Sequence, residues 1–278
     1  MLDAAGVKYT RLETNIDSLE LSYKKEQRKY KIMRMRRKKW ARPELAVCPF
    51  YIEHAEEYKG KWNTVFGNDK PIYAELGCGK GGFVVQAAQY YPDVNWLAMD
   101  IKSEMLAVAR RTITAGFEEK GLEINNIKLV SQNIEKITTA FDENDKIDRI
   151  HINFCNPWPR KRHKKRRLTH TRQLMQYRTF LRDGGEIHFK TDDDELFEES
   201  LPYFEHSGFS VKFITRDLHN SDYASNFETE HEKMFSAEGK KIKLLVAVKE
   251  QLPEGYVPPK EKDELPLEAN EREEDQWQ

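Results

Sequence analysis

The sequence predicts an α/β protein whose core is a doubly wound, mostly parallel sheet of seven strands. Between residues 71 and 249, short apolar runs alternate with segments whose apolar residues recur at helical spacing. The loops between them are short, and a glycine-rich loop follows the first run. The segment Thr215–Lys241, before the last run, is polar and has no helical apolar pattern. We therefore expect the last strand to enter the sheet antiparallel.

The first half of the sheet is predicted from three apolar runs. A helix follows the glycine-rich loop and is stopped by Pro92, and Ser103 is placed to N-cap the next helix. The expected elements are strand 72–76, helix 83–91, strand 94–99, the helix that begins at Ser103, and strand 127–131.

The second half of the sheet is predicted from four further runs. Gly184 and Gly185 separate a helix from the fifth strand, and Gly208 ends the next helix. The expected elements are strand 147–154, helix 174–181, strand 186–190, helix 195–206, strand 209–214 and strand 242–248.

The charge distribution divides the chain into three parts. The formal net charge is −1, but residues 250–278 hold ten acidic and three basic residues, which leaves +6 on residues 1–249. We expect a flexible N-terminal extension at 1–32, one folded domain at 33–249 and an acidic disordered tail at 250–278. Basic runs at Lys24–Arg42 and Arg160–Arg172 are either solvated faces or a surface for a polyanion.

The composition argues against several classes of protein. No stretch approaches the roughly 20 apolar residues that a bilayer span needs, and the N-terminus lacks the apolar run of a secretory signal. The three cysteines, Cys48, Cys78 and Cys155, are far apart and favour no disulfide framework. No Cys/His cluster has zinc spacing. We therefore expect a cytoplasmic protein with no membrane partner and no metal.

The loop Glu75–Gly82 follows the first strand and has the pattern of a nucleoside-cofactor site. Gly77 and Gly79 let the backbone turn tightly and approach a ligand closely. Asp100, at the end of the second strand, is placed to bind two ribose hydroxyls. A nicotinamide-dependent dehydrogenase and an S-adenosylmethionine-dependent methyltransferase both fit this pair.

Two residues favour the methyltransferase. The carboxylate of Glu75 would repel a dinucleotide pyrophosphate, whereas a sulfonium cofactor offers it positive charge. Asn133 follows the third strand, where its side chain either meets an adenine edge or caps a helix.

The stretch 156–168 leaves the fourth strand at the same edge of the sheet. Its two prolines stiffen the turn and hold Asn156 and Trp158 over the site, where the indole can stack on a base. The basic run begins at the rim, and His163 within it is expected to contact a phosphate or the backbone. The Asn-Pro-Trp-Pro order also resembles the loop of adenine and cytosine amino-methyltransferases, which keeps methylation of an exocyclic amine open.

Five motifs carry a family resemblance. They are MRMRRKKWARPELAVCPF at 33–50, ELGCGKGGF at 75–83, NPWPRKRHKKRRL at 156–168, HFKTD at 188–192 and TEHEKMF at 229–235. Together, and in this order, they resemble the bacterial tRNA (guanine-N7-)-methyltransferase family. The resemblance implies a Rossmann-like methyltransferase fold, S-adenosyl-L-methionine as cofactor, tRNA as substrate and 7-methylguanosine as product.

The resemblance also implies three sets of site residues by motif position, with Asn156 and Asp192 as the catalytic residues. Around the cofactor it implies Glu75, Asp100, Asn133 and Asn156, beside Gly77 and Gly79 of the loop. At the substrate it implies Arg160, Asp192, Thr229, Glu230, His231 and Glu232. Against the RNA it implies Arg162, His163, Lys164, Lys165, Arg166 and Arg167.

Many members of the family have Asp where this chain has Asn156. The reaction needs no general base, because guanine N7 carries a free lone pair and no proton and can attack the sulfonium methyl directly. The enzyme then contributes positioning and electrostatic support. Asp192 is expected to select guanine, whose N1–H and N2–H match a carboxylate. A catalytically silent tRNA-binding relative stays an alternative, and the chain is expected to be a monomer or a homodimer.

Overall fold

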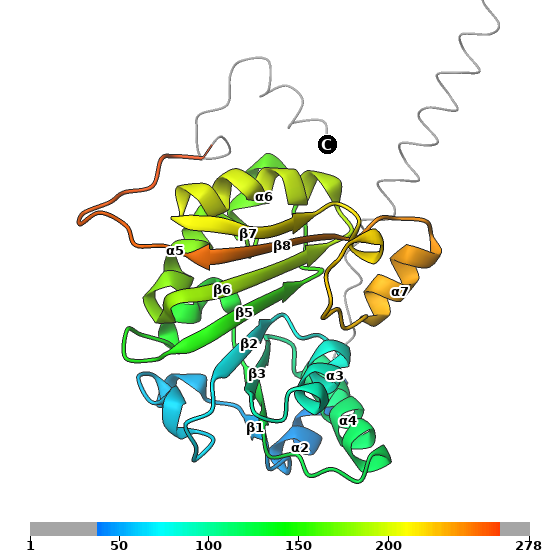
Figure 1. Cartoon of the computed structure of the whole chain (residues 1–278). Coiled ribbons are helices and arrows are strands. Elements are labelled where there is room, and N and C mark those ends of the chain that lie inside the picture. Colours follow the sequence, from blue (N-terminus) through cyan, green and yellow to red (C-terminus); the bar gives the residue numbers. More distant parts are fainter. Residues whose placement is uncertain (1–37, 262–278) are drawn as a thin grey trace, which may run out of the picture. The chain divides into compact units, whose positions relative to one another are not determined.

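Eight strands form one sheet in the computed structural model, which describes residues 38–261 (Figure 1). The strand order is β1-β4-β3-β2-β5-β6-β8-β7, and β2 to β8 are the seven strands expected from the sequence. The doubly wound α/β fold is therefore confirmed, with the two-residue β1 as an addition. The strands are β1 (Tyr51–Ile52), β2 (Ile72–Leu76), β3 (Asn95–Asp100), β4 (Ile127–Ser131), β5 (Ile147–Asn153), β6 (Leu181–Thr191), β7 (Phe209–Thr215) and β8 (Lys243–Lys249).

Neighbouring strands from β1 to β6 in this order are parallel, and the last strand is antiparallel as expected. β8 lies between β6 and β7 and pairs antiparallel with both, so that Val246 is opposite His188 on one side and Phe213 on the other. The parallel registers place the carboxyl ends of β2, β3, β5 and β6 at one edge of the sheet. Ligands of open α/β sheets bind at this edge, so the topology decides where the site lies.

Helices cover both faces of the sheet, as Figure 1 shows. One core cluster packs α2, α3 and α4 against β3 and β4, and the other packs α5 and α6 against the opposite face. All of these elements belong to the compact unit that begins at Lys39. The helices are α2 (Ala41–Ala46), α3 (Gly82–Tyr90), α4 (Ser103–Glu119), α5 (Thr171–Phe180), α6 (Asp194–His206) and α7 (Glu230–Ala237), and 3-10 helices span Ala55–Tyr58, Trp62–Thr64, Ile134–Thr139, Lys161–Arg166 and Leu218–Asn220.

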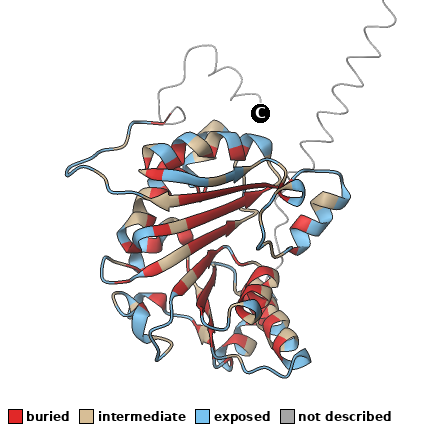
Figure 2. Ribbon diagram, viewed as in Figure 1, coloured by how far each residue is buried: buried red, intermediate tan, exposed pale blue. Residues whose placement is uncertain are grey.

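The central strands are buried on both faces (Figure 2). In β3 the side chains of Trp96 and Leu97 enter opposite core clusters, and both are almost fully buried. Strands covered on both faces read as continuous apolar runs, which is why the sequence predicted them well. Each such side chain contributes about 1.5–3 kcal/mol by leaving water.

Two local predictions are wrong. Lys102 is the N-cap of α4 and makes no side-chain capping hydrogen bond, so Ser103 is the first helical residue instead of the cap. Gly184 and Gly185 do not separate a helix from a strand, because β6 already begins at Leu181 and its register against β5 shifts beside them. A Cβ on Gly185 would lie 2.8 Å from the Arg182 carbonyl oxygen, so this irregularity requires glycine.

Within residues 250–261, Tyr256 and Glu261 contact α5 and α6. Glu261 is buried, and its carboxylate bonds to Thr171 Oγ1 and, at 3.1 Å, to His206 Nδ1. The Tyr256 hydroxyl donates to the His206 carbonyl at 3.0 Å. The expected extension at 1–32 and the remaining tail, 262–278, lie outside the described residues.

No helix within residues 38–261 combines the length and the apolar character that crossing a bilayer requires.

Candidate active site

The glycine-rich loop turns from β2 into α3 beside the end of β3. Gly77, Gly79 and Gly81 all have positive φ, which explains why glycines occupy these positions. The backbone amides of Gly77 and Cys78 donate to the Met99 carbonyl at 2.9 and 2.8 Å. These bonds fix the loop against the neighbouring strand, so its shape is set before any ligand binds.

Asp100 closes the loop from the end of β3. One of its carboxylate oxygens accepts from the Gly79 amide at 3.2 Å and the other from the Lys102 amide at 2.8 Å. Burial raises its pKa, and these two amides oppose that effect. The carboxylate is thus held in place by backbone donors, as a ligand-binding acid at a strand end should be.

The loop borders a cavity of about 110 Å³. Four groups of residues line it: the loop with the start of α3, the ends of β2 and β5, two residues of α4, and the first turn of α7 with its N-cap. The lining residues include Glu75, Gly77, Gly79, Lys80, Met105, Asn153, Phe154, Thr229, Glu230 and His231. Six of the residues expected around cofactor or substrate are thereby brought together, namely Glu75, Gly77, Gly79, Thr229, Glu230 and His231.

Glu75 is the buried acid of this cavity. One carboxylate oxygen accepts from Asn153 Nδ2 at 3.1 Å, and the other has no hydrogen-bond partner among the described residues. Burial raises the pKa of Glu75 to about 8, although the Asn153 hydrogen bond and the charge of Lys190 act in the other direction. A buried oxygen without a partner is costly, and a cationic ligand group in the cavity would satisfy it.

Asn133 caps a helix, which is one of the two roles the sequence left open. Its Oδ1 accepts from the Glu135 amide at 3.0 Å, at the start of the 3-10 helix Ile134–Thr139. Asn133 is not among the residues that line the cavity. Its proposed contact with the cofactor would therefore involve the amide nitrogen or the backbone.

The Asn156 loop leaves β5 through a strained backbone. Phe154 and Trp158 have φ values of 52° and 43°, a conformation that is uncommon for bulky residues and typical of functional loops. The exposed Asn156 accepts from the Trp158 amide at 3.4 Å through its Oδ1. Two side chains of the basic run contact Trp158. The Arg166 guanidinium carbon lies 4.1 Å from the centre of its ring, and the His163 ring is edge-on with the ring centres 5.7 Å apart.

The basic run does not form one uniform surface, and two of the residues expected to bind RNA are internal. The Arg167 side chain is 1% exposed, donates to the Pro157 carbonyl at 2.6 Å and pairs with Glu199. Lys164 pairs with the same Glu199 and with Glu195. Arg167 therefore connects the Asn156 loop to α6, and Lys164 connects the 3-10 helix that follows the loop to α6.

The remaining members of the run lie nearer the surface. Arg162 and Lys165 are exposed, as are Arg160 and Arg166, although Arg166 pairs with Glu135 at 3.0 Å. Burial lowers the pKa of His163, and the neighbouring arginines add to this effect. The His163 ring packs edge-on against Trp158, and its expected contact with a phosphate or the backbone stays a prediction.

Asp192 lies just beyond β6 at the same sheet edge. Its carboxylate pairs with Lys240 at 2.8 Å, and Lys243 Nζ donates to its backbone carbonyl at 2.9 Å. Its neighbour Asp193 caps α6 by accepting from the Leu196 amide at 2.7 Å. The Asp192 carboxylate therefore already has Lys240 as a cationic partner, and a guanine base bound there would share this carboxylate with Lys240.

The segment before and within α7 supplies the rest of the expected substrate residues. Thr229 caps α7 by accepting from the Glu232 amide at 3.1 Å. Glu230 pairs with Lys80 of the glycine-rich loop at 2.7 Å, and His231 stacks on Phe154. Glu232, by contrast, does not line the cavity and is completely buried. The structure thus assigns Glu232 a place behind the site instead of at its surface.

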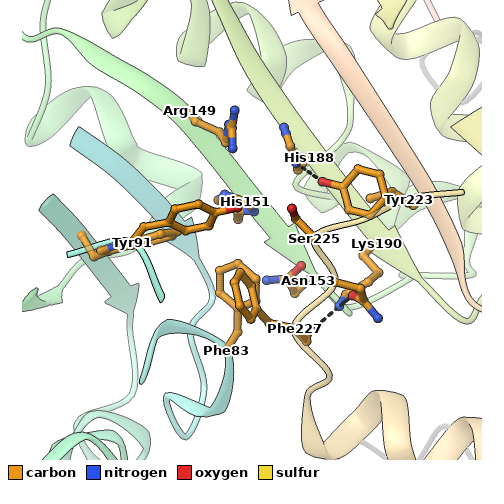
Figure 3. Close-up of a pocket in the computed structure, with 13 residues that line it drawn as sticks. Phe83, Tyr91, Arg149, His151, Asn153, His188, Lys190, Tyr223, Ser225 and Phe227 are labelled. Carbon is orange, nitrogen blue, oxygen red and sulfur yellow. Dashed lines mark hydrogen bonds between the residues drawn. The ribbon is translucent and has the colours of Figure 1, made fainter. Parts of the chain in front are cut away.

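A second, smaller cavity of about 30 Å³ adjoins the first through Phe83 and Asn153 (Figure 3). It lies between β5, β6 and residues 223–227. The Tyr223 hydroxyl bonds to His188 Nδ1 at 3.0 Å. Burial lowers the pKa of His151 well below its ordinary value, so this ring is neutral. Sequence reasoning did not find this cluster, because its members come from separate motifs with no shared spacing.

Comparisons with known proteins show the family to which the chain belongs. Residues 69–245 match the family model described as "Putative methyltransferase". The chain is similar to the tRNA (guanine-N(7)-)-methyltransferase of Clostridium beijerinckii, with 60% identity over 78% of this chain and 100% of that protein. The Ruminiclostridium cellulolyticum protein of the same name is 54% identical over 77% of this chain and 92% of its own length.

Among solved structures, the 16S rRNA methyltransferase KamB superposes with a TM-score of 0.50 and 11% identity over 66% of this chain and 89% of that one. This likeness shows a shared methyltransferase fold. The extent of identity with the clostridial proteins shows more, and the chain belongs to the tRNA (guanine-N(7)-)-methyltransferase family.

Proposed function

We propose that this protein transfers the methyl group of S-adenosyl-L-methionine to N7 of a guanosine in tRNA. The observation that carries the proposal is the cavity beside the glycine-rich loop, with the unpaired oxygen of Glu75 at its edge. Its other wall is the segment that contains Thr229, Glu230 and His231. A cationic donor and a nucleic-acid acceptor can therefore approach one another here. The family membership supports the same reaction.

The residues present fit S-adenosyl-L-methionine. Its ammonium group would satisfy the unpaired oxygen of Glu75, and its ribose would meet Asp100 at the end of β3. Asn133 and Asn156 are proposed as further contacts. When bound, this cofactor supplies an electrophilic methyl group on a sulfonium centre.

The protein's own residues position the acceptor. Asn156 stands on a rigid loop at the carboxyl end of β5 and orients groups through its amide, with no proton to remove from N7. Asp192, which pairs with Lys240, is proposed to accept from N1–H and N2–H of the guanine. Adenine lacks this pair of donors, so Asp192 would also set the specificity.

The exposed part of the basic run is proposed to hold the tRNA backbone. Arg160, Arg162 and Lys165 lie on the surface of the segment that follows the Asn156 loop. Phosphates bound there would fix the register of the RNA, while the residues at the cavity select the base.

The decisive experiment is methyl transfer from labelled S-adenosyl-L-methionine to unmodified tRNA, followed by identification of the nucleosides. Labelled 7-methylguanosine is the expected product and would show that Asn156 suffices. A methylated exocyclic amine would favour an amino-methyltransferase. Binding of both tRNA and cofactor without transfer would identify a catalytically silent relative.

A further inference from the structure

Lys190 of β6 is a buried lysine whose ammonium group makes three hydrogen bonds. Its side chain is 4% exposed. The Nζ atom donates to Asn226 Oδ1 at 2.9 Å, to the Phe227 carbonyl at 3.0 Å and to the Glu232 carboxylate. An ammonium group has three donors, and here each has an acceptor. All three acceptors belong to one segment, residues 226–232, which is defined here as the strap.

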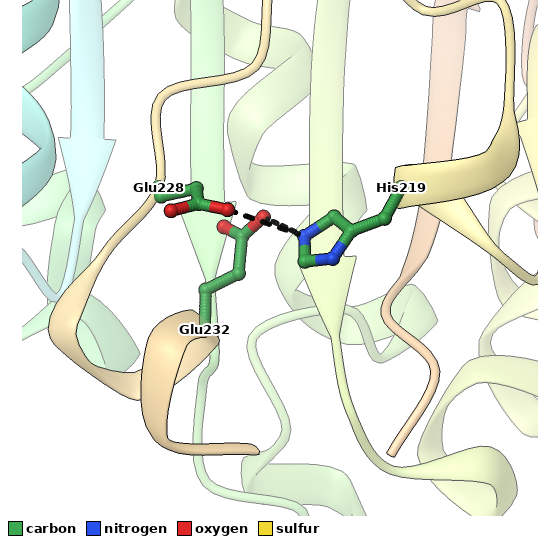
Figure 4. Close-up of side chains that lie close together, drawn as sticks. All are labelled: His219, Glu228 and Glu232. Carbon is green, nitrogen blue, oxygen red and sulfur yellow. Dashed lines mark hydrogen bonds and ion pairs between the residues drawn. The ribbon is translucent and has the colours of Figure 1, made fainter. Parts of the chain in front are cut away.

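The Glu232 carboxylate, which pairs with Lys190, also bonds to other side chains. Besides Lys190, its carboxylate accepts from Asn226 Nδ2 at 2.6 Å and from His219 Nε2 at 2.8 Å. Figure 4 shows Glu232 and Glu228 facing the His219 ring. These three side chains offer ligand atoms close enough for a metal ion, but the Glu232 carboxylate is already bonded to Lys190, Asn226 and His219. These three side chains are therefore not proposed as a metal site.

The middle of the strap forms one wall of the active-site cavity. Thr229, Glu230 and His231 line the cavity, whereas Asn226, Phe227 and Glu232 are bonded to Lys190, and Asn226 and Phe227 line the smaller cavity beside it. A second attachment comes from α3, where Gln86 Nε2 donates to the Glu228 carbonyl at 2.8 Å. Lys190 thus holds both ends of a segment whose centre faces the reactants.

We propose that Lys190 is a positioning residue for methyl transfer, and that Glu232 acts by anchoring the strap to Lys190. The proposal rests on the proposed function and adds to it the group that holds one wall of the site. β6 lies in the interior of the sheet between β5 and β8, so it provides a rigid base for this attachment. Displacement of reacting groups by about 1 Å can cost about 100-fold in rate, which is the scale of effect expected here.

The test compares Lys190→Met with Lys190→Arg and with a matched control, Lys249→Met. Lys249 Nζ, on the adjacent strand β8, likewise bonds to two backbone carbonyls, of Arg178 and Leu181, and to the Asp183 carboxylate. Lys249 and its partners lie outside the lining of the cavity. For each folded variant, kcat and the KM for tRNA are measured with saturating S-adenosyl-L-methionine, together with amide hydrogen exchange of residues 226–233.

Lys190→Met is expected to lower kcat about 100-fold, to change the KM for tRNA by less than about threefold, and to speed exchange at the strap amides. Lys190→Arg should recover at least tenfold of the lost rate, because it restores a cation. Lys249→Met should leave kcat and strap exchange as in the wild type. If Lys190→Met does not fold, Asn226→Ala is used instead. It removes one acceptor of Lys190 and one donor to Glu232 while keeping the Lys190–Glu232 ion pair, and a decrease of about fivefold in kcat is expected.

Two results would overturn the inference. One is a Lys190→Met enzyme whose strap exchanges faster but whose kcat equals that of the wild type. The other is equal loss of kcat in Lys190→Met and Lys249→Met, which would indicate a general effect on folding. A wild-type enzyme that forms no 7-methylguanosine in tRNA would instead refute the proposed function itself.

Discussion

The charge of the buried Glu75 carboxyl group depends on what occupies the cavity. With a pKa of about 8 it is largely protonated at neutral pH in the absence of ligand. Because its folded pKa lies above the ordinary value of 4.5, the associated stability is present below pH 4.5 and is lost as pH rises through 8. A cationic ligand favours the ionised form and so opposes this trend.

Binding of S-adenosyl-L-methionine at pH 7 should therefore release about one proton, and its affinity should rise with pH up to about 8. Calorimetry in two buffers that differ in ionisation enthalpy measures this release directly. Glu75→Gln, which cannot ionise, should bind more weakly and lose that proton release. Wild-type binding that releases no proton would contradict the assignment of the ammonium group to Glu75.

Asn156 gives a second prediction at the residue scale. Since N7 has no proton to remove, a carboxylate is not required, and Asn156→Asp should keep kcat within about threefold. Asn156→Ala removes the side chain that accepts from the Trp158 amide and should lower kcat by at least about tenfold. Single-turnover assays with labelled cofactor would decide. An Ala variant with near-wild-type turnover would refute a positioning role.

The basic run at the 3-10 helix Lys161–Arg166 and Arg167 contains both exposed and buried cations. Its exposed residues Arg162 and Lys165 are available to phosphates, whereas Arg167 is buried and bonded to Glu199 and Pro157. The double variant Arg162→Ala/Lys165→Ala should reduce the salt dependence of tRNA binding by about 1.5 in the logarithmic slope, without lowering Tm.

Arg167→Met should have the opposite pattern. It leaves the Pro157 carbonyl without its partner and Glu199 with Lys164 alone among the described residues, and we expect a loss of about 3 kcal/mol in the free energy of unfolding. Thermal unfolding and binding titrations at several salt concentrations measure both quantities. If Arg167→Met lowered the salt slope and left Tm unchanged, the buried role assigned to Arg167 would be wrong.

The sequence predicted the elements whose pattern is local. β2 to β8 are apolar runs, and six of the residues predicted at the site line the cavity. α7 was missed because its one buried residue is the charged Glu232, which gives no amphipathic signal. Lys190 and Asn153 were missed because their partners, the strap and Glu75, are about 36 to 78 residues away in sequence. Such contacts follow from the sheet topology, which spacing does not reveal.

At the scale of the whole molecule, residues 250–261 contact α5 and α6 through Tyr256 and Glu261, and neither residue lines the cavity. The double variant Tyr256→Phe/Glu261→Ala removes bonds to His206 and Thr171. We expect a loss of about 2 kcal/mol and a fall in Tm of about 6 °C, with kcat at 25 °C unchanged. Val257→Ala, at a position that is 81% exposed, is the control. An unchanged Tm would show that this segment contributes nothing to the fold.

The place of β8 in the sheet also sets the order in which the protein can be completed. β8 is the last strand to leave the ribosome, yet it lies between β6 and β7, and β7 at the sheet edge pairs with it. A nascent chain that ends before residue 243 therefore exposes the edge of β6 beside Lys190, where another chain could pair. The pairing of β6, the strand that carries Lys190, is thus complete only after β8 has been made.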